Sequence, residues 1–216
     1  MTRRVLIVSL LAGVTGCLVL RDADARDRLY QELDGQNAIV EGAPTLAPFQ
    51  HVRFCLKYPA DCTSSPADLE RIELKVETLE LLRRVNNSVN IAIAPKLKGY
   101  GPELKDSWKI APVSGDCNDY ANTKRHKLLE SGLPSKALRL SVVKTPSGIG
   151  HLVLVIATTK GDLVLDNLTD SINDWQSTDY HWLKIQSASD ARFWYEVRSP
   201  ARISLSSKNV RLAGRQ

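Results

Sequence analysis

Apolar residues in the first half of the chain recur with the three- and four-residue spacing of amphipathic helices. Between residues 65 and 89, those that would share one helical face are Leu69, Ile72, Val76, Leu79 and Leu82. Ser65 and Asp68 have the spacing of a capping box, and Pro66 would occupy the first helical position. The pattern therefore predicts one long helix that begins at Ser65 and packs on the core.

A second helix is predicted from about Asp116 to Ser131. Its end is marked by the sequence SGLP, in which Gly132 suits the position after a helix and Pro134 prevents continuation. This helix would begin one residue before Cys117.

The second half of the chain changes to the period of two that is typical of strands. The candidate strands are ALRLSVVKT, HLVLVIATT, DLVLDNL, YHWLKIQS and ARFWYEVR, at residues 137–145, 151–159, 162–168, 180–187 and 191–198. The second of them is nearly all apolar, which indicates a central strand. N-terminal helices followed by such a run predict an α+β fold, with the helices packed on an antiparallel sheet.

The first 25 residues have the three parts of a secretory signal peptide. Arg3 and Arg4 precede an apolar run, and an A-x-A site ends at Ala25. The sequence VTGC also resembles a lipobox, in which cleavage would leave a lipidated Cys17. Because the apolar run continues past Cys17 to Leu20, cleavage after Ala25 is favoured, and we expect a periplasmic protein.

The rest of the chain divides into two parts. Residues 26–48 lack periodicity and are expected to be a linker or an irregular arm, whereas residues 49–216 are expected to form a single domain. The sequence of 216 residues is 43% hydrophobic and 25% charged, as in folded proteins. Acidic residues are interleaved with basic ones, so the net charge of +5 indicates no nucleic-acid partner.

The mature chain would keep three cysteines in an oxidising space. Cys55 and Cys62 lie close together in FCLKYPADC, with a Tyr-Pro turn between them, so we expect a local disulfide. The alternative is two buried free thiols. The disulfide leaves Cys117 as a free thiol that requires an explanation.

Cys117 would lie in the first turn of the second helix, where free backbone N–H groups and the helix dipole favour a thiolate nucleophile. Such a nucleophile needs a base. His126 projects from the opposite side of the same helix, and His51 and His181 carry no further signal. His151 opens an otherwise apolar strand and is the candidate base.

Asp166 ends the next strand and is the candidate group that orients the imidazole. With a two-residue turn at Lys160-Gly161, Asp166 and His151 would face the same side of the sheet but lie four positions out of register. Each of the three residues alone has an ordinary structural role: a packed cysteine, a turn histidine or a strand-end aspartate. Their combination in this order favours a catalytic site.

Several segments in a consistent order resemble one family. They are FCLKYPADC, VNNSVN, YGPELKDSW, GDCNDYANTKRHKLLESGLP, GIGHLVLVI, GDLVLDNL and YHWLKIQS. These segments resemble the bacterial transglutaminase-like cysteine proteinases, the family of the LapG-type periplasmic adhesin-cleaving proteases. The resemblance implies a papain-like, transglutaminase-type fold and a catalytic triad of Cys117, His151 and Asp166.

The family pattern around the cysteine is GDCED, and the resemblance implies that the acids flanking the cysteine bind calcium. This chain keeps Asp116 and Asp119 but has Asn118 after the cysteine. We therefore expect a weak calcium site at these three residues and no required cofactor.

The expected function is hydrolysis of a peptide bond in a protein substrate by an exported cysteine peptidase. The resemblance further implies a surface adhesin as substrate and a membrane receptor that controls access. Two alternatives remain: transglutaminase-like acyl transfer to an amine, and a catalytically silent binding domain of the same fold. Trp108 and Tyr120 are near Cys117 in sequence and could line the cleft or pack in the core.

Overall fold

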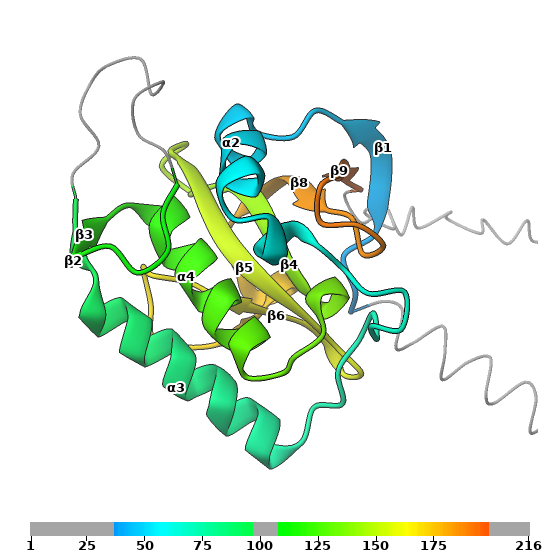
Figure 1. The fold of residues 1–216 in the computed structure, drawn as a ribbon, viewed down its shortest axis with the longest axis horizontal. Coiled ribbons are helices and arrows are strands. Elements are labelled where there is room, and N and C mark those ends of the chain that lie inside the picture. The colour runs from blue at the N-terminus through cyan, green and yellow to red at the C-terminus, as the bar shows by residue number, and fades with distance from the viewer. Residues whose placement is uncertain (1–36, 97–107, 199–216) are drawn as a thin grey trace, which may run out of the picture.

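The computed structural model describes residues 37–96 and 108–198. Within them, one antiparallel sheet has the strand order β1-β9-β8-β4-β5-β6-β7 (Figure 1). The strands are β1 (Glu41–Thr45), β4 (Leu138–Lys144), β5 (Gly150–Thr158), β6 (Gly161–Leu165), β7 (Asn173–Asp174), β8 (His181–Gln186) and β9 (Trp194–Val197). The predicted α+β class, with helices packed on an antiparallel sheet, is confirmed.

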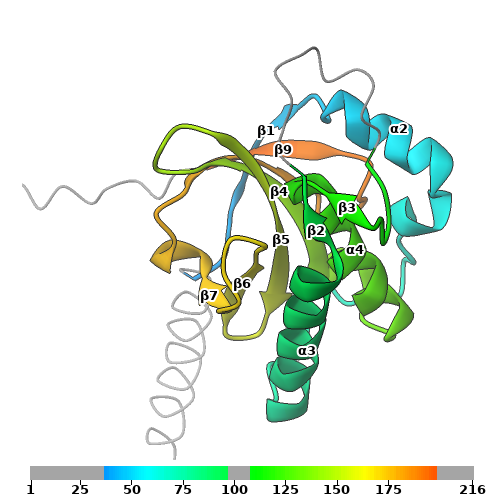
Figure 2. The same cartoon turned by 90° about the vertical axis from the view of Figure 1, so that its left-hand side faces the viewer.

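Three helices are described: α2 (Phe49–Lys57), α3 (Val76–Ala92) and α4 (Cys117–Glu130). Helix α4 runs along β5, and α3 packs against α4 (Figure 2). A two-stranded parallel pair, β2 (Ala94–Pro95) with β3 (Ser114–Gly115), leads directly into α4. No helix in the described ranges is long and apolar enough to cross a membrane.

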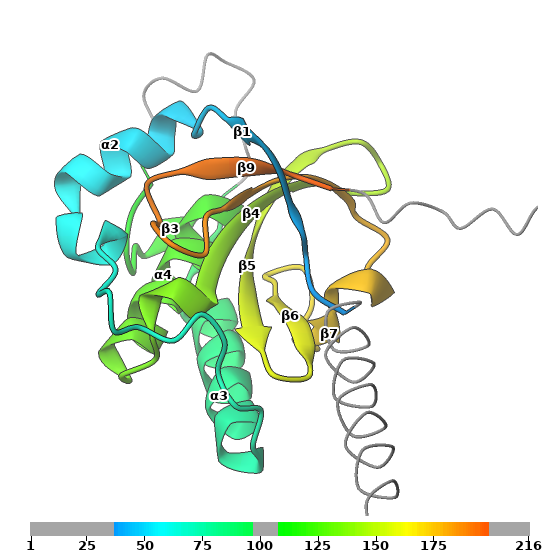
Figure 3. The same ribbon diagram turned by 90° about the vertical axis from the view of Figure 1, so that its right-hand side faces the viewer.

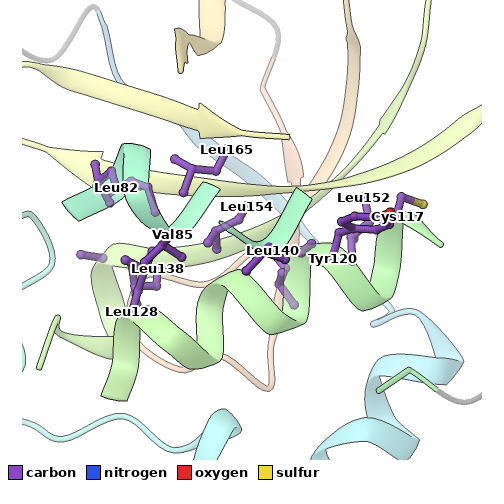
Figure 4. Close-up of a cluster of buried hydrophobic side chains, with 14 of the residues drawn as sticks. Leu82, Val85, Cys117, Tyr120, Leu128, Leu138, Leu140, Leu152, Leu154 and Leu165 are labelled. Carbon is purple, nitrogen blue, oxygen red and sulfur yellow. The ribbon is translucent and has the colours of Figure 1, made fainter. Parts of the chain in front are cut away.

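Strand β5 has the central place that its apolar sequence predicts. Leu152 and Leu154 of β5 belong, with Leu140 of the neighbouring strand β4, to the cluster of buried side chains between the sheet and the helices (Figure 4). Val153 and Val155 point the other way into a second buried cluster. Because alternate residues of a strand face opposite sides, a strand covered on both sides is apolar at nearly every position.

Helix α4 begins and ends within one residue of the prediction. The Asp116 carboxylate accepts from the backbone N–H of Asn118 at 2.9 Å, and the Asp119 carboxylate accepts from the backbone N–H of Asp116 at 3.2 Å. These bonds satisfy N–H groups at the start of the helix. Gly132, with φ of +84°, follows its end and has the left-handed conformation that favours glycine.

The long helix predicted from Ser65 is wrong over its first eleven residues, because α3 begins at Val76. The Asp68 carboxylate does accept from the backbone N–H of Ser65, and the Ser65 hydroxyl accepts from the backbone N–H of Ala67, but these bonds close a single turn. Beyond it the chain is extended, and the backbone of Ile72 bonds to Ala157 and Thr159 next to the end of β5. Pairing with the sheet buries Ile72, so tertiary contact overrides the local helical preference.

The prediction of a linker or irregular arm over residues 26–48 is wrong for residues 41–45. They form β1, which pairs antiparallel with β9 at one edge of the sheet (Figure 3). The Glu41 carboxylate also accepts from Arg139 Nη2 at 2.6 Å and from the backbone N–H of Ala188 at 2.8 Å. The sequence carries little sign of this strand, since its partners are distant along the chain. The predicted signal peptide, residues 1–25, lies outside the described residues.

The predicted Cys55–Cys62 disulfide is present and joins the end of α2 to the short turn that follows it. Cys117 is a free thiol. The disulfide therefore leaves Cys117 available for chemistry, as the cysteine count predicts.

Candidate active site

Cys117 is the first residue of α4, and its side chain reaches a cleft of about 440 Å³. The cleft is lined by Pro48, Phe49, Gln50, Trp108, Cys117, Asn118, Val142, Gly150, His151, Leu152 and Lys184. Trp108 thus lines the cleft while packing in the core, whereas Tyr120 is buried and lies outside the lining. The thiol is placed where a helix N-terminus stabilises negative charge.

The ring of His151 and the carboxylate of Asp166 meet across β5 and β6. Leu154 pairs with Leu165, so Asp166 faces Val153 and lies on a diagonal from His151, two residues away. Diagonal neighbours on one face of a sheet are within reach of long side chains. The distance from His151 Nε2 to Asp166 Oδ1 is 2.8 Å, and both side chains are buried.

The turn between β5 and β6 lies one residue earlier than predicted. Thr158 pairs with Gly161, so the turn residues are Thr159 and Lys160. The Thr158 hydroxyl donates to the Gly161 carbonyl at 2.6 Å and accepts from the Lys160 N–H at 3.1 Å. With this turn, β6 is displaced by two positions along β5 from its predicted register. Asp166 therefore lies two positions, rather than four, from the point opposite His151, and the two side chains are diagonal neighbours.

Three further groups hold the Asp166 residue, and none of them was predicted. The Tyr180 hydroxyl donates to Asp166 Oδ2. The backbone N–H of Leu168 donates to Asp166 Oδ1 at 3.0 Å, and Asn90 Nδ2 donates to the Asp166 carbonyl at 3.1 Å. Tyr180 was predicted as the first residue of a strand; its distance along the chain from Asp166 concealed the contact.

The electrostatics of the site favour a charged imidazole. Burial alone lowers the pKa of His151, but its hydrogen bonds to Asp166 and Cys117, together with the charges of those two groups, raise that pKa to about 9. Burial raises the pKa of Asp166, and the opposing contacts with His151, Tyr180 and Leu168 leave it below its usual value. Nε2 of His151 is bonded to Asp166, so Nδ1 is the nitrogen left for Cys117. The arrangement suits a thiolate–imidazolium pair.

Two of the other three histidines, His51 and His126, are bonded elsewhere, and the third, His181, is exposed at the start of β8. His51 is buried and accepts a hydrogen bond from Trp194 Nε1 at 3.2 Å. Burial and the charge of Arg125 lower its pKa to about 4. His126 bonds to Asp61 at 3.0 Å, on the side of α4 away from the cleft, as predicted.

The three residues predicted as a weak calcium site mostly satisfy one another. Asp116 Oδ1 accepts from both the backbone N–H and the Nδ2 of Asn118, each at 2.9 Å. The two carboxylate oxygens of Asp119 accept from the backbone N–H groups of Lys109 and Asp116. These contacts form the helix cap, and calcium binding by the same oxygen-bearing side chains stays a prediction.

A buried free cysteine at a helix N-terminus, beside an imidazole bonded to a buried carboxylate, is the arrangement of papain-like cysteine peptidases. The chain belongs to the bacterial transglutaminase-like cysteine proteinase (BTLCP) family, whose sequence profile matches residues 41–202. The protein is therefore a cysteine peptidase with a transglutaminase-like fold, and its substrate is a protein.

Solved structures of LapG from Legionella pneumophila are similar to this chain. The calcium-bound form shares 22% sequence identity, with a TM-score of 0.49 over 83% of this chain and 93% of that chain. The EGTA-treated form shares 19%, with a TM-score of 0.47 over 80% and 86% of the two chains. No curated protein matches the chain.

Proposed function

We propose that this protein is an exported peptidase that hydrolyses a peptide bond of a protein substrate through Cys117, His151 and Asp166. The observation that carries the proposal is the position of His151, which is bonded to Asp166 through Nε2 and lines the same cleft as Cys117. A third group that orients the base is what separates a catalytic pair from two neighbouring polar residues.

The reaction follows from this geometry. The Cys117 thiolate attacks the carbonyl carbon, and the backbone N–H of Cys117 donates to the developing oxyanion. The His151 imidazolium then protonates the leaving amine as the C–N bond breaks, which leaves a thioester on Cys117. Water attacks the thioester while His151 accepts its proton, and the acid product leaves with the thiol restored. Asp166 keeps the imidazole oriented throughout.

The proposal also covers the kind of protein substrate and the cellular location. The signal pattern of residues 1–25 supports a periplasmic location, with cleavage after Ala25 favoured over lipidation at Cys17. The resemblance of the sequence segments to LapG-type adhesin-cleaving proteases is the support for a large surface adhesin as substrate and a membrane receptor that controls access to it. The cleft of about 440 Å³ beside Cys117 is where a segment of such a protein would bind.

We further propose that calcium binds weakly and that activity does not require it. Support comes from Asn118, which places an amide where the family pattern has a carboxylate, and from the hydrogen bonds that Asp116 Oδ1 and both carboxylate oxygens of Asp119 already accept. LapG has been solved in calcium-bound and EGTA-treated forms, which makes calcium the ion to test.

The test uses purified residues 26–216, labelled casein as a general protein substrate, and iodoacetamide as a thiol probe. Wild-type protein should cleave casein and should react with iodoacetamide at Cys117 well below pH 8. Cys117→Ser and His151→Ala should abolish cleavage and remain folded. His181→Ala, which alters an exposed histidine at the start of β8, is the matched control and should keep activity. Cleavage near the wild-type rate in Cys117→Ser would contradict the mechanism.

The same assay separates hydrolysis from acyl transfer to an amine, because both reactions pass through the thioester. A labelled primary amine added to the reaction should stay free if water is the acceptor. Its incorporation into casein, with loss of the incorporation in Cys117→Ser, would instead assign a transferase.

A further inference from the structure

Helix α2 lies at the outside of the molecule beside β9, and only one of its faces is packed (Figure 3). His51 and Phe54 on this face are buried. The centroids of their rings lie 5.2 Å from that of Trp194 and 6.4 Å from that of Trp108, respectively. The disulfide also ties the end of the helix to the turn that follows it. The packed face and the disulfide therefore hold α2 in place.

The opposite face of α2 carries three exposed apolar side chains. Phe49, Val52 and Leu56 are spaced so that they share one side of the helix, and they are 61%, 47% and 81% exposed. Single apolar residues on a surface are common, but a contiguous apolar patch is typical of an interaction site. Because so much of their surface is exposed, these side chains contribute little to the core. We call Phe49, Val52 and Leu56 the α2 stripe.

The α2 stripe connects the catalytic cleft to a second pocket. Phe49 lines the cleft that contains Cys117. Val52 and Leu56 line a pocket of about 370 Å³, together with the disulfide and Arg192. From Phe49 to Leu56 the helix rises about 10 Å, and an extended chain covers this length with about three or four residues. A peptide segment bound in the cleft can therefore continue along the stripe into the pocket.

The charged groups along this surface are mostly basic. Lys184 lines the cleft, Arg192 lines the second pocket, and no acidic side chain is among the described residues that line either of them. Asp190, outside the lining, is bonded to Arg192 at 2.6 Å. Helix α2 itself carries Arg53 and Lys57 and no acidic residue. A segment with apolar and acidic side chains is the one that complements such a surface.

We propose that the α2 stripe is a substrate-binding surface that extends the catalytic cleft. Its occupant is an extended segment of the protein substrate, with apolar side chains next to acidic ones, about three or four residues beyond the part that contacts Phe49. The proposal rests on the proposed peptidase function. Burial of the exposed side chains of the stripe favours binding, and because α2 is already held in place, little order is lost when the segment binds.

The first test measures binding in the absence of cleavage. In the Cys117→Ser protein, the fluorescence anisotropy of labelled casein, an unfolded acidic protein with many apolar side chains, gives the Kd. Val52→Ser and Leu56→Ser should each raise this Kd roughly tenfold, the size expected when one aliphatic side chain is no longer buried. Ile91→Ser changes an apolar residue of α3 that is 84% exposed, and as the matched control it should leave the Kd unchanged.

The second test measures cleavage by proteins that keep Cys117. Leu56→Ser should raise the KM for casein roughly tenfold with little change in kcat, because Leu56 lies outside the lining of the cleft. A peptide of about six residues, centred on the casein bond that the wild type cleaves, is too short to cover both the cleft and Leu56. Wild type and Leu56→Ser should therefore cleave this peptide at equal rates. The rate at which iodoacetamide labels Cys117 should also be unchanged.

Equal casein Kd values for Val52→Ser, Leu56→Ser and Ile91→Ser would overturn the proposal. Loss of a dimer in Leu56→Ser, seen by sedimentation, with casein binding unchanged, would also overturn it and assign the stripe to a second copy of the chain. Failure of the proposed function gives a different result. In that case the wild type would lack thiol-dependent cleavage, while the casein Kd in the Cys117→Ser protein would still report whether the stripe binds.

Discussion

His151 and Asp166 are in contact across a diagonal of the sheet. Nε2 and Oδ1 are 2.8 Å apart, although Asp166 faces Val153 in the strand register. The contact depends on the turn at Thr159 and Lys160, because a turn one residue later would move Asp166 two positions further away. The alignment of the proposed base is therefore set at the opposite end of the β5–β6 hairpin from the thiol.

The first prediction concerns pH. The raised pKa of His151, about 9, means that the imidazolium persists below that pH and is lost as the pH rises through it. Casein cleavage should therefore fall above about pH 9. Asp166→Asn removes the negative charge that helps to raise this pKa, so its alkaline limit should move toward the ordinary histidine value of about 6.5.

Asp166→Asn should also lower kcat roughly a thousandfold or more, as replacing the orienting aspartate does in other triads. Asp179→Asn, an exposed change near the site, is its control. The measurement is kcat/KM between pH 5 and 10. An unchanged alkaline limit in Asp166→Asn would show that Asp166 does not set the proton affinity of His151.

The second prediction concerns Tyr180, whose hydroxyl donates to Asp166 Oδ2. Tyr180→Phe removes one hydrogen bond to a charged group, an interaction of about 1.5–3 kcal/mol. We expect kcat to fall about tenfold, with the fold retained. Tyr195→Phe, on β9, is the matched control and should have the wild-type rate. Equal rates in both variants would make the Tyr180 hydroxyl dispensable.

The third prediction concerns the disulfide. Peptide mapping by mass spectrometry should find Cys55 linked to Cys62 and Cys117 free. Reduction should lower the free energy of unfolding by about 2.5 kcal/mol, because a short loop is released in the unfolded chain. Urea denaturation of the Cys117→Ser protein, with and without reductant, isolates this effect. A bridge from Cys117 to either of the other cysteines would contradict its role as nucleophile.

The fourth prediction concerns calcium. Titration calorimetry should show weak or no calcium binding to the wild type, and cleavage should survive EGTA. Asn118→Glu restores the acid of the family pattern and should tighten binding, because affinity rises with the number of carboxylates. Asn118→Gln lengthens the side chain without adding charge and is the matched control. Tight binding by the wild type, with all activity lost in EGTA, would show that Asn118 is an adequate ligand.

Some elements of the fold could be predicted from the sequence and others could not. Helix α4 was predicted within one residue because its signals are local: Asp116 and Asp119 cap its start, and Gly132 follows its end. The prediction that the side chains of His151 and Asp166 point to the same side of the sheet followed from the alternation of residues along each strand. The segment after Ser65 was predicted wrongly because its capping signal is genuine but closes one turn, after which Ile72 pairs with the sheet.

The sequence by itself determined which residues are available for chemistry: a free thiol at a helix start, a histidine that opens a buried strand, and an acid one strand later. Helix caps and strand alternation are properties of neighbouring residues, so they can be seen along the chain. The tertiary structure alone decided what surrounds Asp166. Tyr180 and Asn90 reach it from separate elements, because side-chain contacts depend on how the helices and sheet pack, and that packing leaves no periodic mark on the sequence.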